Sequence, residues 1–150
     1  MPGLQAQLRR LKEAGFRLIL VTNQSGVGKG LMTLAELEAL HARMQAALGA
    51  EALDAIYYCP HHPDAGCLCR KPAPALIQRA CAEHNLDARR SFMLGDEGRD
   101  IEMGRAAGCL TILCRTHLSK LVIQPLRCPP DFQAQTLGEA VDWILKTSHG

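Results

Sequence analysis

The chain has 150 residues, of which 47% are hydrophobic, and this is enough for one domain with a buried core. A net charge of +2 and an aromatic content of 4% argue against a nucleic-acid-binding protein, and no apolar run approaches the roughly 20 residues that span a bilayer. Seven cysteines, with Arg9, Arg10 and Lys12 interrupting any apolar leader, indicate a reducing compartment, so we expect a cytoplasmic protein.

Hydrophobic periodicity predicts helices that alternate with short apolar strands. Thr33 and Glu36 form a capping box where one helix begins, and Gly108 ends another. In chain order we expect a helix at 4–14, a strand at 16–21, a helix at 34–48, a strand at 55–58, a helix at 73–84, a strand at 91–94, a helix at 98–107, a strand at 110–114, an irregular segment at 117–136 and a helix at 137–146. This alternation is typical of a parallel sheet covered by helices on both faces, within one domain spanning residues 1–150.

One short loop, from position 59 to position 69, combines cysteine and histidine at spacings that suit a metal. A Cys-x-His pair and a Cys-x-Cys pair can each hold one ion from two sides, and thiolate with imidazole favours tetrahedral zinc. Four protein ligands leave no position for water, so such a site would be structural. His62 is a second imidazole that the spacing does not exclude. The predicted zinc ligands are Cys59, His61, Cys67 and Cys69.

Polar residues follow the first predicted strand, where open α/β sheets bind their ligands. Hydroxyls, side-chain amides and backbone N–H groups suit a phosphate, although an ordinary capped turn would have the same composition. Gly28-Lys29 hints at a nucleotide-binding P-loop, but Asn23 and Gly30 do not fit that motif, and we reject this interpretation. The candidate phosphate-binding residues are Thr22, Asn23, Gln24 and Ser25.

Charged residues follow the second and third predicted strands. Lys71, next to Arg70, could stabilise a phosphoryl group in transfer, whereas a solvated basic pair is the simpler alternative. Asp96 and Asp100 lie four residues apart where a helix begins, and a carboxylate there is a natural magnesium ligand. The alternative is that Asp96 caps the helix and Asp100 forms an ion pair in its first turn.

Together these segments resemble the haloacid-dehalogenase-like phosphatases, most specifically the group that contains D-glycero-D-manno-heptose-bisphosphate phosphatase and histidinol phosphatase. The resemblance runs from about Gly3 to Leu145 and is most specific in the Cys/His loop. It is carried by residues 21–26, 57–63, 67–72, 95–96, 100 and 106–108. It implies an α/β fold with a Rossmann-like parallel sheet, helices on both faces, a zinc-binding loop and no cap domain.

The resemblance also implies roles for individual residues. Thr22 and Lys71 would stabilise the transferring phosphoryl group, and Asp96 would bind Mg²⁺. Asp100 would orient Lys71 or Asp96 rather than contact the metal. The implied substrate-binding residues are Thr22, Asn23, Gln24, Ser25, Arg70 and Lys71, and the implied Zn²⁺ ligands are Cys59, His61, Cys67 and Cys69.

Two features depart from the family pattern. Glu97 stands where the heptose enzyme carries a lysine near its substrate, which reverses a charge. The family also uses an aspartate nucleophile and an aspartate acid/base in an Asp-x-Asp-Gly-Thr segment on the central first strand, and the chain contains no Asp-x-Asp. We therefore expect an N-terminally truncated domain, catalytically incomplete as it stands. Its neighbouring strands would pair directly, or the sheet would be split.

The function expected from the resemblance is hydrolysis of a sugar phosphate, most specifically D-glycero-D-manno-heptose 1,7-bisphosphate, as in lipopolysaccharide biosynthesis. The alternatives are a histidinol-phosphate phosphatase and a non-catalytic, zinc-stabilised module that binds phosphorylated ligands or a partner chain. The expected cofactors are Mg²⁺ and Zn²⁺. We expect a monomer whose partner is a small-molecule sugar phosphate, not a nucleic acid or a membrane.

Overall fold

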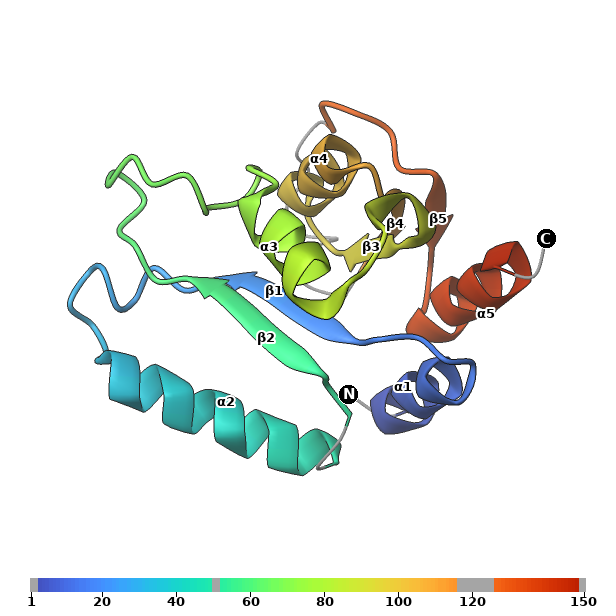
Figure 1. Ribbon diagram of the computed structural model, residues 1–150, viewed down its shortest axis with the longest axis horizontal. Helices are drawn as coiled ribbons and strands as arrows, with labels where there is room; N and C mark the ends of the chain where they lie inside the picture. Colours follow the sequence, from blue (N-terminus) through green and yellow to red (C-terminus); the bar gives the residue numbers. More distant parts are fainter. Residues whose placement is uncertain (1–2, 50–51, 116–125, 149–150) are drawn as a thin grey trace. The chain divides into compact units, whose positions relative to one another are not determined.

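The computed structural model describes residues 3–49, 52–115 and 126–148. The chain forms two compact units, Met1–Arg70 and Lys71–Gly150. Each unit contains parallel β-strands and α-helices (Figure 1). In the segment expected to be irregular, residues 117–125 lie outside the described residues. No helix in the described ranges has the length and hydropathy needed to cross a bilayer.

The first unit contains two helices and a two-stranded parallel sheet. Its elements are α1 (Leu4–Glu13), β1 (Ile19–Asn23), α2 (Leu34–Leu48) and β2 (Ala55–Cys59). The strands pair in register from Ile19 opposite Ala55 to Asn23 opposite Cys59. The ends of β1 and β2 therefore lie side by side, and the loops that follow them begin at the same edge of this sheet.

Strand β1 begins and ends later than the apolar run predicts. The N–H of Leu18 donates to the Asp54 carboxylate at 2.7 Å, and the N–H of Asp54 donates to the Leu18 carbonyl at 2.7 Å. The backbone donor of Leu18 is thus paired with a side chain, and the strand begins at the next residue. At the other end, Thr22 and Asn23 pair with β2, so these polar residues belong to the strand rather than to the turn after it.

Helix α2 forms where its capping box predicts. The Glu36 N–H donates to the Thr33 hydroxyl at 3.1 Å, and the Thr33 N–H donates to the Glu36 carboxylate at 3.3 Å. On its buried face, the His41 ring lies 5.4 Å from the Tyr58 ring of β2. The buried hydrophobic residues of this unit are Leu11, Leu37, Tyr57 and Cys59.

The second unit contains a three-stranded parallel sheet in the order β3-β4-β5. Its elements are α3 (Ala75–His84), a 3₁₀ turn η1 (Ala88–Arg90), β3 (Phe92–Gly95), α4 (Gly98–Ala107), β4 (Leu110–Cys114), β5 (Phe132–Ala134) and α5 (Leu137–Ser148). Helix α4 ends at Gly108, which adopts the left-handed conformation at φ 95° as expected for a terminating glycine.

Helices α4 and α5 cover opposite faces of this sheet. On β3, Phe92 contacts the Trp143 ring of α5 edge-to-face at 5.9 Å. The next residue, Met93, packs against Gly104 of α4, where an added Cβ would lie 2.6 Å from the Met93 Cβ. Since successive strand residues point to opposite faces, the two helices lie on different sides. This confirms the predicted parallel sheet with helices on both faces for this unit.

Strand β5 lies inside the segment expected to be irregular. It has three residues, too few for a periodic pattern, and Asp131 fixes its start. The Asp131 carboxylate accepts hydrogen bonds from the Thr111 N–H at 2.7 Å and the Thr111 hydroxyl at 3.0 Å.

The strands form two sheets, β1-β2 and β3-β4-β5. A split sheet is one of the arrangements expected without an Asp-x-Asp strand.

Candidate active site and metal centre

The end of β1 and the turn after it carry the predicted phosphate-binding residues. Thr22 lies opposite Tyr58 and Asn23 opposite Cys59 in the β1–β2 pair. The Gln24 N–H continues this pairing by donating to the Cys59 carbonyl at 2.8 Å. The Gln24 side-chain amide also donates to the Thr22 hydroxyl at 3.3 Å. Thr22, Asn23 and Gln24 are therefore held together, beside the first residue of the Cys/His loop.

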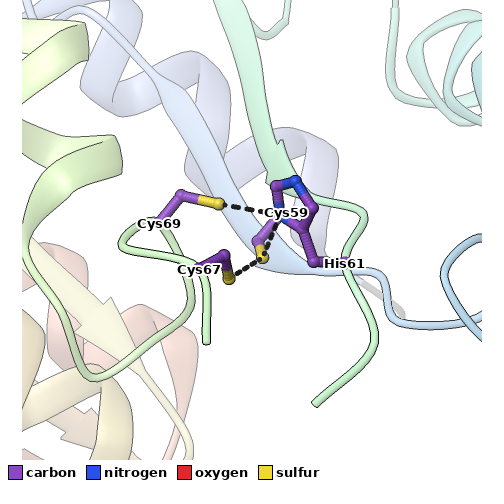
Figure 2. Close-up of side chains that lie close together, drawn as sticks. All are labelled: Cys59, His61, Cys67 and Cys69. Atoms are coloured by element: carbon purple, nitrogen blue, oxygen red, sulfur yellow. Dashed lines mark hydrogen bonds between the residues drawn. The ribbon is translucent and has the colours of Figure 1, made fainter. Parts of the chain in front are cut away.

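Cysteine and histidine side chains converge at the end of β2 (Figure 2). Within the described residues, the ligand atoms of Cys59, His61, Cys67 and Cys69 all lie within 4.8 Å of one another. The Cys59 Sγ is 3.4 Å from both the His61 Nδ1 and the Cys67 Sγ, and the Cys69 Sγ is 3.2 Å from the same His61 nitrogen. The predicted four residues form one cluster.

The structure also distinguishes the two adjacent histidines. His61 points its Nδ1 into the cluster, as Figure 2 shows. The Nδ1 of His62 instead accepts a hydrogen bond from the Asp64 N–H at 3.0 Å, and the His62 side chain is 45% exposed. Spacing left both imidazoles open, whereas the fold assigns His61 to the cluster.

The thiols of the cluster influence one another strongly. Burial raises the pKa of Cys67, but hydrogen bonds with Cys59 and with backbone groups further along the loop outweigh it, and the pKa falls to about 7. Burial and the neighbouring thiols Cys59 and Cys67 raise the pKa of Cys69 to about 12. One thiol ionises readily, and its charge then opposes ionisation of the next. A divalent cation would remove this opposition, so the donor set fits Zn²⁺.

Arg70 follows the last cysteine of the loop. Its side chain is half-buried. In the described part of the chain, its Nη1 is buried and has no hydrogen-bond partner. Buried polar atoms are normally paired, so this guanidinium has unused capacity to bind an anion.

In the second unit, Lys71 and Asp100 form an ion pair. The Lys71 Nζ donates to the Asp100 Oδ1 at 2.7 Å, and their side chains are 13% and 5% exposed. The other carboxylate oxygen, Oδ2, accepts the Glu97 N–H at 3.2 Å. A Cβ added at Gly95 would overlap the Asp100 side chain, so only glycine at the end of β3 leaves room for it. The contact expected between Lys71 and Asp100 is present.

Asp96 directly follows β3 and is exposed. The residue that caps α4 is Glu97, not Asp96. Glu97 and Asp100 form the capping box at the start of this helix. The capping alternative for Asp96 is therefore wrong. Asp100, in the first turn of α4, does form an ion pair, and its partner Lys71 lies 29 residues away. Asp96 keeps its carboxylate at the carboxyl end of the strand, where a magnesium ligand is expected.

Sequence reasoning did not identify two features of this region. Glycine at position 95 leaves room for the Asp100 side chain at the end of β3. The only sequence signal for this is the Gly-Asp dipeptide before the helix. Glu97 binds Arg99 through two hydrogen bonds, from Nη2 at 2.7 Å and Nε at 3.2 Å. The acidic charge at position 97 thus has a basic partner two residues away, which its spacing in the sequence could have suggested.

Comparison with known proteins agrees with this fold and these clusters. Residues 68–140 match the HAD-hydrolase-like family. The D-glycero-beta-D-manno-heptose-1,7-bisphosphate 7-phosphatase of Helicobacter pylori is 39% identical over 146 residues, which are 95% of this chain and 80% of the relative. The enzyme of the same name from Yersinia pestis is 42% identical over 155 residues, covering 97% of this chain and 76% of the relative.

Solved structures give the same result. The D,D-heptose 1,7-bisphosphate phosphatase of B. bronchiseptica, crystallised with magnesium and phosphate, matches with a TM-score of 0.85 and 32% identity, covering 98% of this chain and 84% of that one. The α/β fold and the strand-end clusters therefore define a HAD-like phosphatase. Within that class, the chain belongs to the D-glycero-D-manno-heptose-1,7-bisphosphate 7-phosphatase family.

Proposed function

We propose that this chain provides the phosphate-binding, metal-binding and zinc-binding parts of a phosphatase for D-glycero-D-manno-heptose 1,7-bisphosphate. The observation that carries the proposal is the Lys71–Asp100 pair at 2.7 Å beside the strand end that bears Asp96. A lysine fixed in this way can stabilise the oxygens of a transferring phosphoryl group without reorganising during the reaction. Membership of the heptose-bisphosphate phosphatase family supports the choice of substrate.

The roles of the remaining residues are those that the family resemblance implies, and their chemistry suits them. The Thr22 hydroxyl would donate to a phosphoryl oxygen, with Asn23, Gln24 and Ser25 beside the substrate. Arg70, with its buried and unsatisfied Nη1, would recognise an anionic or hydroxyl group of the sugar phosphate. Asp96 would hold Mg²⁺, which neutralises phosphate charge when bound. Zn²⁺ held by Cys59, His61, Cys67 and Cys69 would be structural.

The charge reversal at Glu97 does not by itself exclude the heptose substrate. Arg99 donates two hydrogen bonds to the Glu97 carboxylate, so the acidic charge at this position is balanced by a neighbouring cation. A histidinol phosphate remains an alternative substrate, and the two can be separated by assaying both with the same polypeptide.

The 150 residues contain no Asp-x-Asp, the segment that supplies the nucleophile and the acid/base in this family. We therefore propose that a polypeptide of these residues alone binds phosphate without hydrolysing its esters. Positioning of a nucleophile in line with the leaving group can contribute about 7–11 kcal/mol, so its loss lowers the rate by several orders of magnitude. The second candidate is a non-catalytic module that binds phosphorylated ligands, which the buried and unpaired Arg70 Nη1 also suits.

The decisive experiment measures phosphate release from the heptose bisphosphate with magnesium. It compares the 150-residue polypeptide, the same polypeptide with an Asp-x-Asp-Gly-Thr strand grafted before Pro2, and the grafted form with Lys71→Ala. We expect activity only in the second. Robust turnover by the ungrafted polypeptide that disappears in Asp96→Ala would contradict the proposed mechanism. An inactive grafted form that still binds phosphate would favour the non-catalytic module.

Phosphate binding is tested separately by chemical shifts in the ungrafted chain. We expect inorganic phosphate to bind near Lys71 in the millimolar range, about −4 kcal/mol. The shifts should be lost in Lys71→Ala. Shifts that persist unchanged in that variant would argue against this placement.

A further inference from the structure

Gly28 lies in the loop after β1 and joins it to the Cys/His loop. Its N–H donates to the Pro60 carbonyl at 2.8 Å, and the Gln24 N–H donates to the Cys59 carbonyl at 2.8 Å. Both acceptors belong to the Cys-x-His segment that supplies two predicted zinc ligands. Two backbone hydrogen bonds therefore connect the phosphate-binding turn with the metal cluster inside the first unit.

The contact at Gly28 leaves no room for a side chain. A Cβ added there would overlap the backbone of His61 and His62. Backbone atoms next to a metal ligand cannot swing aside as the end of a flexible side chain can. Gly26, two residues earlier in the same loop, is different, since a Cβ there would meet only the Met32 Sδ at 3.9 Å, an ordinary contact distance.

The loop between these contacts is itself closed by hydrogen bonds. The Lys29 N–H donates to the Ser25 carbonyl at 2.9 Å, and the Leu31 N–H donates to the Gly26 carbonyl at 2.8 Å. A displacement at Gly28 would therefore move residues on both sides of it, including Ser25, rather than being absorbed locally.

We propose that Gly28 is a positioning residue through which the ion held by the Cys/His loop fixes the end of β1, with Thr22, and the turn after it, with Ser25. This inference rests on the proposed zinc site and on the proposed role of the turn. Zinc holds Cys59 and His61, which fix the Cys59 and Pro60 carbonyls, and these in turn hold the N–H groups of Gln24 and Gly28. Zinc then has a role in shaping the substrate site, beyond stabilising its own loop.

The first test compares the zinc affinity of the full chain with that of Gly28→Ala and Gly26→Ala, by competition with a chelator. Partners that orient metal ligands typically change affinity by about 10–100-fold when they are altered. We expect Gly28→Ala to bind zinc that much more weakly and Gly26→Ala to bind it as the unaltered chain does. Equal affinity in both variants would overturn the proposal while leaving the zinc site standing.

The second test uses the unaltered chain, so it decides the matter even where Gly28→Ala does not fold. Hydrogen exchange is followed at the amides of Gln24 and Gly28, with zinc bound and after chelation. The control is the Asp54 amide, which donates to the Leu18 carbonyl at the other end of the β1–β2 pair. We expect chelation to speed exchange at Gln24 and Gly28 and to leave Asp54 unchanged.

The remaining outcomes are equally decisive. Unchanged exchange at Gln24 and Gly28 after zinc removal would overturn the coupling. So would an equal loss of protection at all three amides, because zinc would then stabilise the whole unit rather than this turn. An unaltered chain that binds no zinc would overturn both the coupling and the proposed zinc site.

Discussion

The Cys/His cluster of the first unit and the Lys71–Asp100 pair of the second differ in how their charges are balanced. The cluster gathers three thiols and one imidazole, and burial together with the neighbouring thiols Cys59 and Cys67 raises the pKa of Cys69. The Lys71–Asp100 pair is already neutral, since opposite charges meet at 2.7 Å. The cluster therefore balances its charge only with a cation from outside, whereas in the pair a positive and a negative group already meet.

The strongest test of this comparison is removal of zinc. A ligand present at about 1,000 times its Kd stabilises the folded state by about 4 kcal/mol, and chelation removes that stabilisation. Cys67→Ser should lose most of the metal and show the same lowered stability. The measurements are zinc content by elemental analysis and the free energy of unfolding in urea, with and without zinc.

His62→Ala is the matched control, because His62 adjoins the ligand His61 but points its Nδ1 at the Asp64 N–H instead. It should retain one zinc per chain. Metal loss in this variant would mean that the wrong histidine has been assigned to the cluster.

The second test removes half of the ion pair. Asp100→Ala removes the buried carboxylate that accepts from the Lys71 ammonium at 2.7 Å. Breaking a buried pair in this way typically lowers stability by about 3–5 kcal/mol. The fluorescence of Trp143, the single tryptophan, reports unfolding of this unit in urea.

The double variant Lys71→Met with Asp100→Leu provides the comparison for that experiment. It removes both charges together and should be clearly more stable than Asp100→Ala alone. Equal destabilisation by the single and the double change would show that the cost is lost packing rather than an uncompensated charge.

A charge pair in the first unit extends the comparison to pH. Burial raises the pKa of Asp54. Hydrogen bonds from Lys12 and from the Leu18 N–H, together with the charges of Lys12 and Arg17, outweigh burial and lower the pKa overall. A carboxyl with a lowered pKa stabilises the fold above its unfolded pKa of about 3.9, and loses this effect as pH falls through the folded value.

We therefore expect Asp54→Asn to cost about 2 kcal/mol at pH 7 and little at pH 2, measured by urea unfolding at both pH values. Asp64→Asn is the control, since the Asp64 side chain is 91% exposed and should not matter at either pH. A loss in Asp54→Asn that is the same at both pH values would assign the effect to packing instead of charge.

The smallest effect is expected at the exposed pair of Glu97 and Arg99, whose side chains are 50% and 46% exposed. Exposed ion pairs contribute about 0–1 kcal/mol, so Arg99→Ala should leave the urea midpoint nearly unchanged. Arg99→Ala should also weaken binding of the sugar bisphosphate in the grafted enzyme, because the Glu97 carboxylate would then be unbalanced and repel the phosphate. A large loss of stability would show that this pair resembles Lys71–Asp100 after all.

Sequence reasoning was most successful where the signal is local. The capping box of Thr33 and Glu36 and the terminating Gly108 gave the start of α2 and the end of α4. The four zinc-ligand candidates lie within eleven positions, so chain connectivity alone keeps them close. These features depend on neighbours in sequence and on side-chain chemistry that does not change with the fold.

It was least successful where partners come from distant segments. Asp54 sets the start of β1 through Leu18, 36 residues away, and Asp131 secures β5 through Thr111. The choice of His61 over His62 likewise depends on how the loop turns, because both imidazoles satisfy the spacing. The sequence does not show that neighbouring atoms lie too close to Gly28 and Gly95 for a side chain. A glycine can be required by a positive φ angle as well as by such a contact.

The overlap at Gly28 has an evolutionary consequence. Gly28 contributes no ligand atom. The backbone of the Cys/His loop nevertheless leaves no room for any other residue at this position. Descendants of this chain that lose the cysteines and shorten the Cys/His loop should also be released from glycine at position 28, while those that keep the four ligands should keep it. Position 28 and the cysteines would then change together across lineages, as an inherited record of their contact.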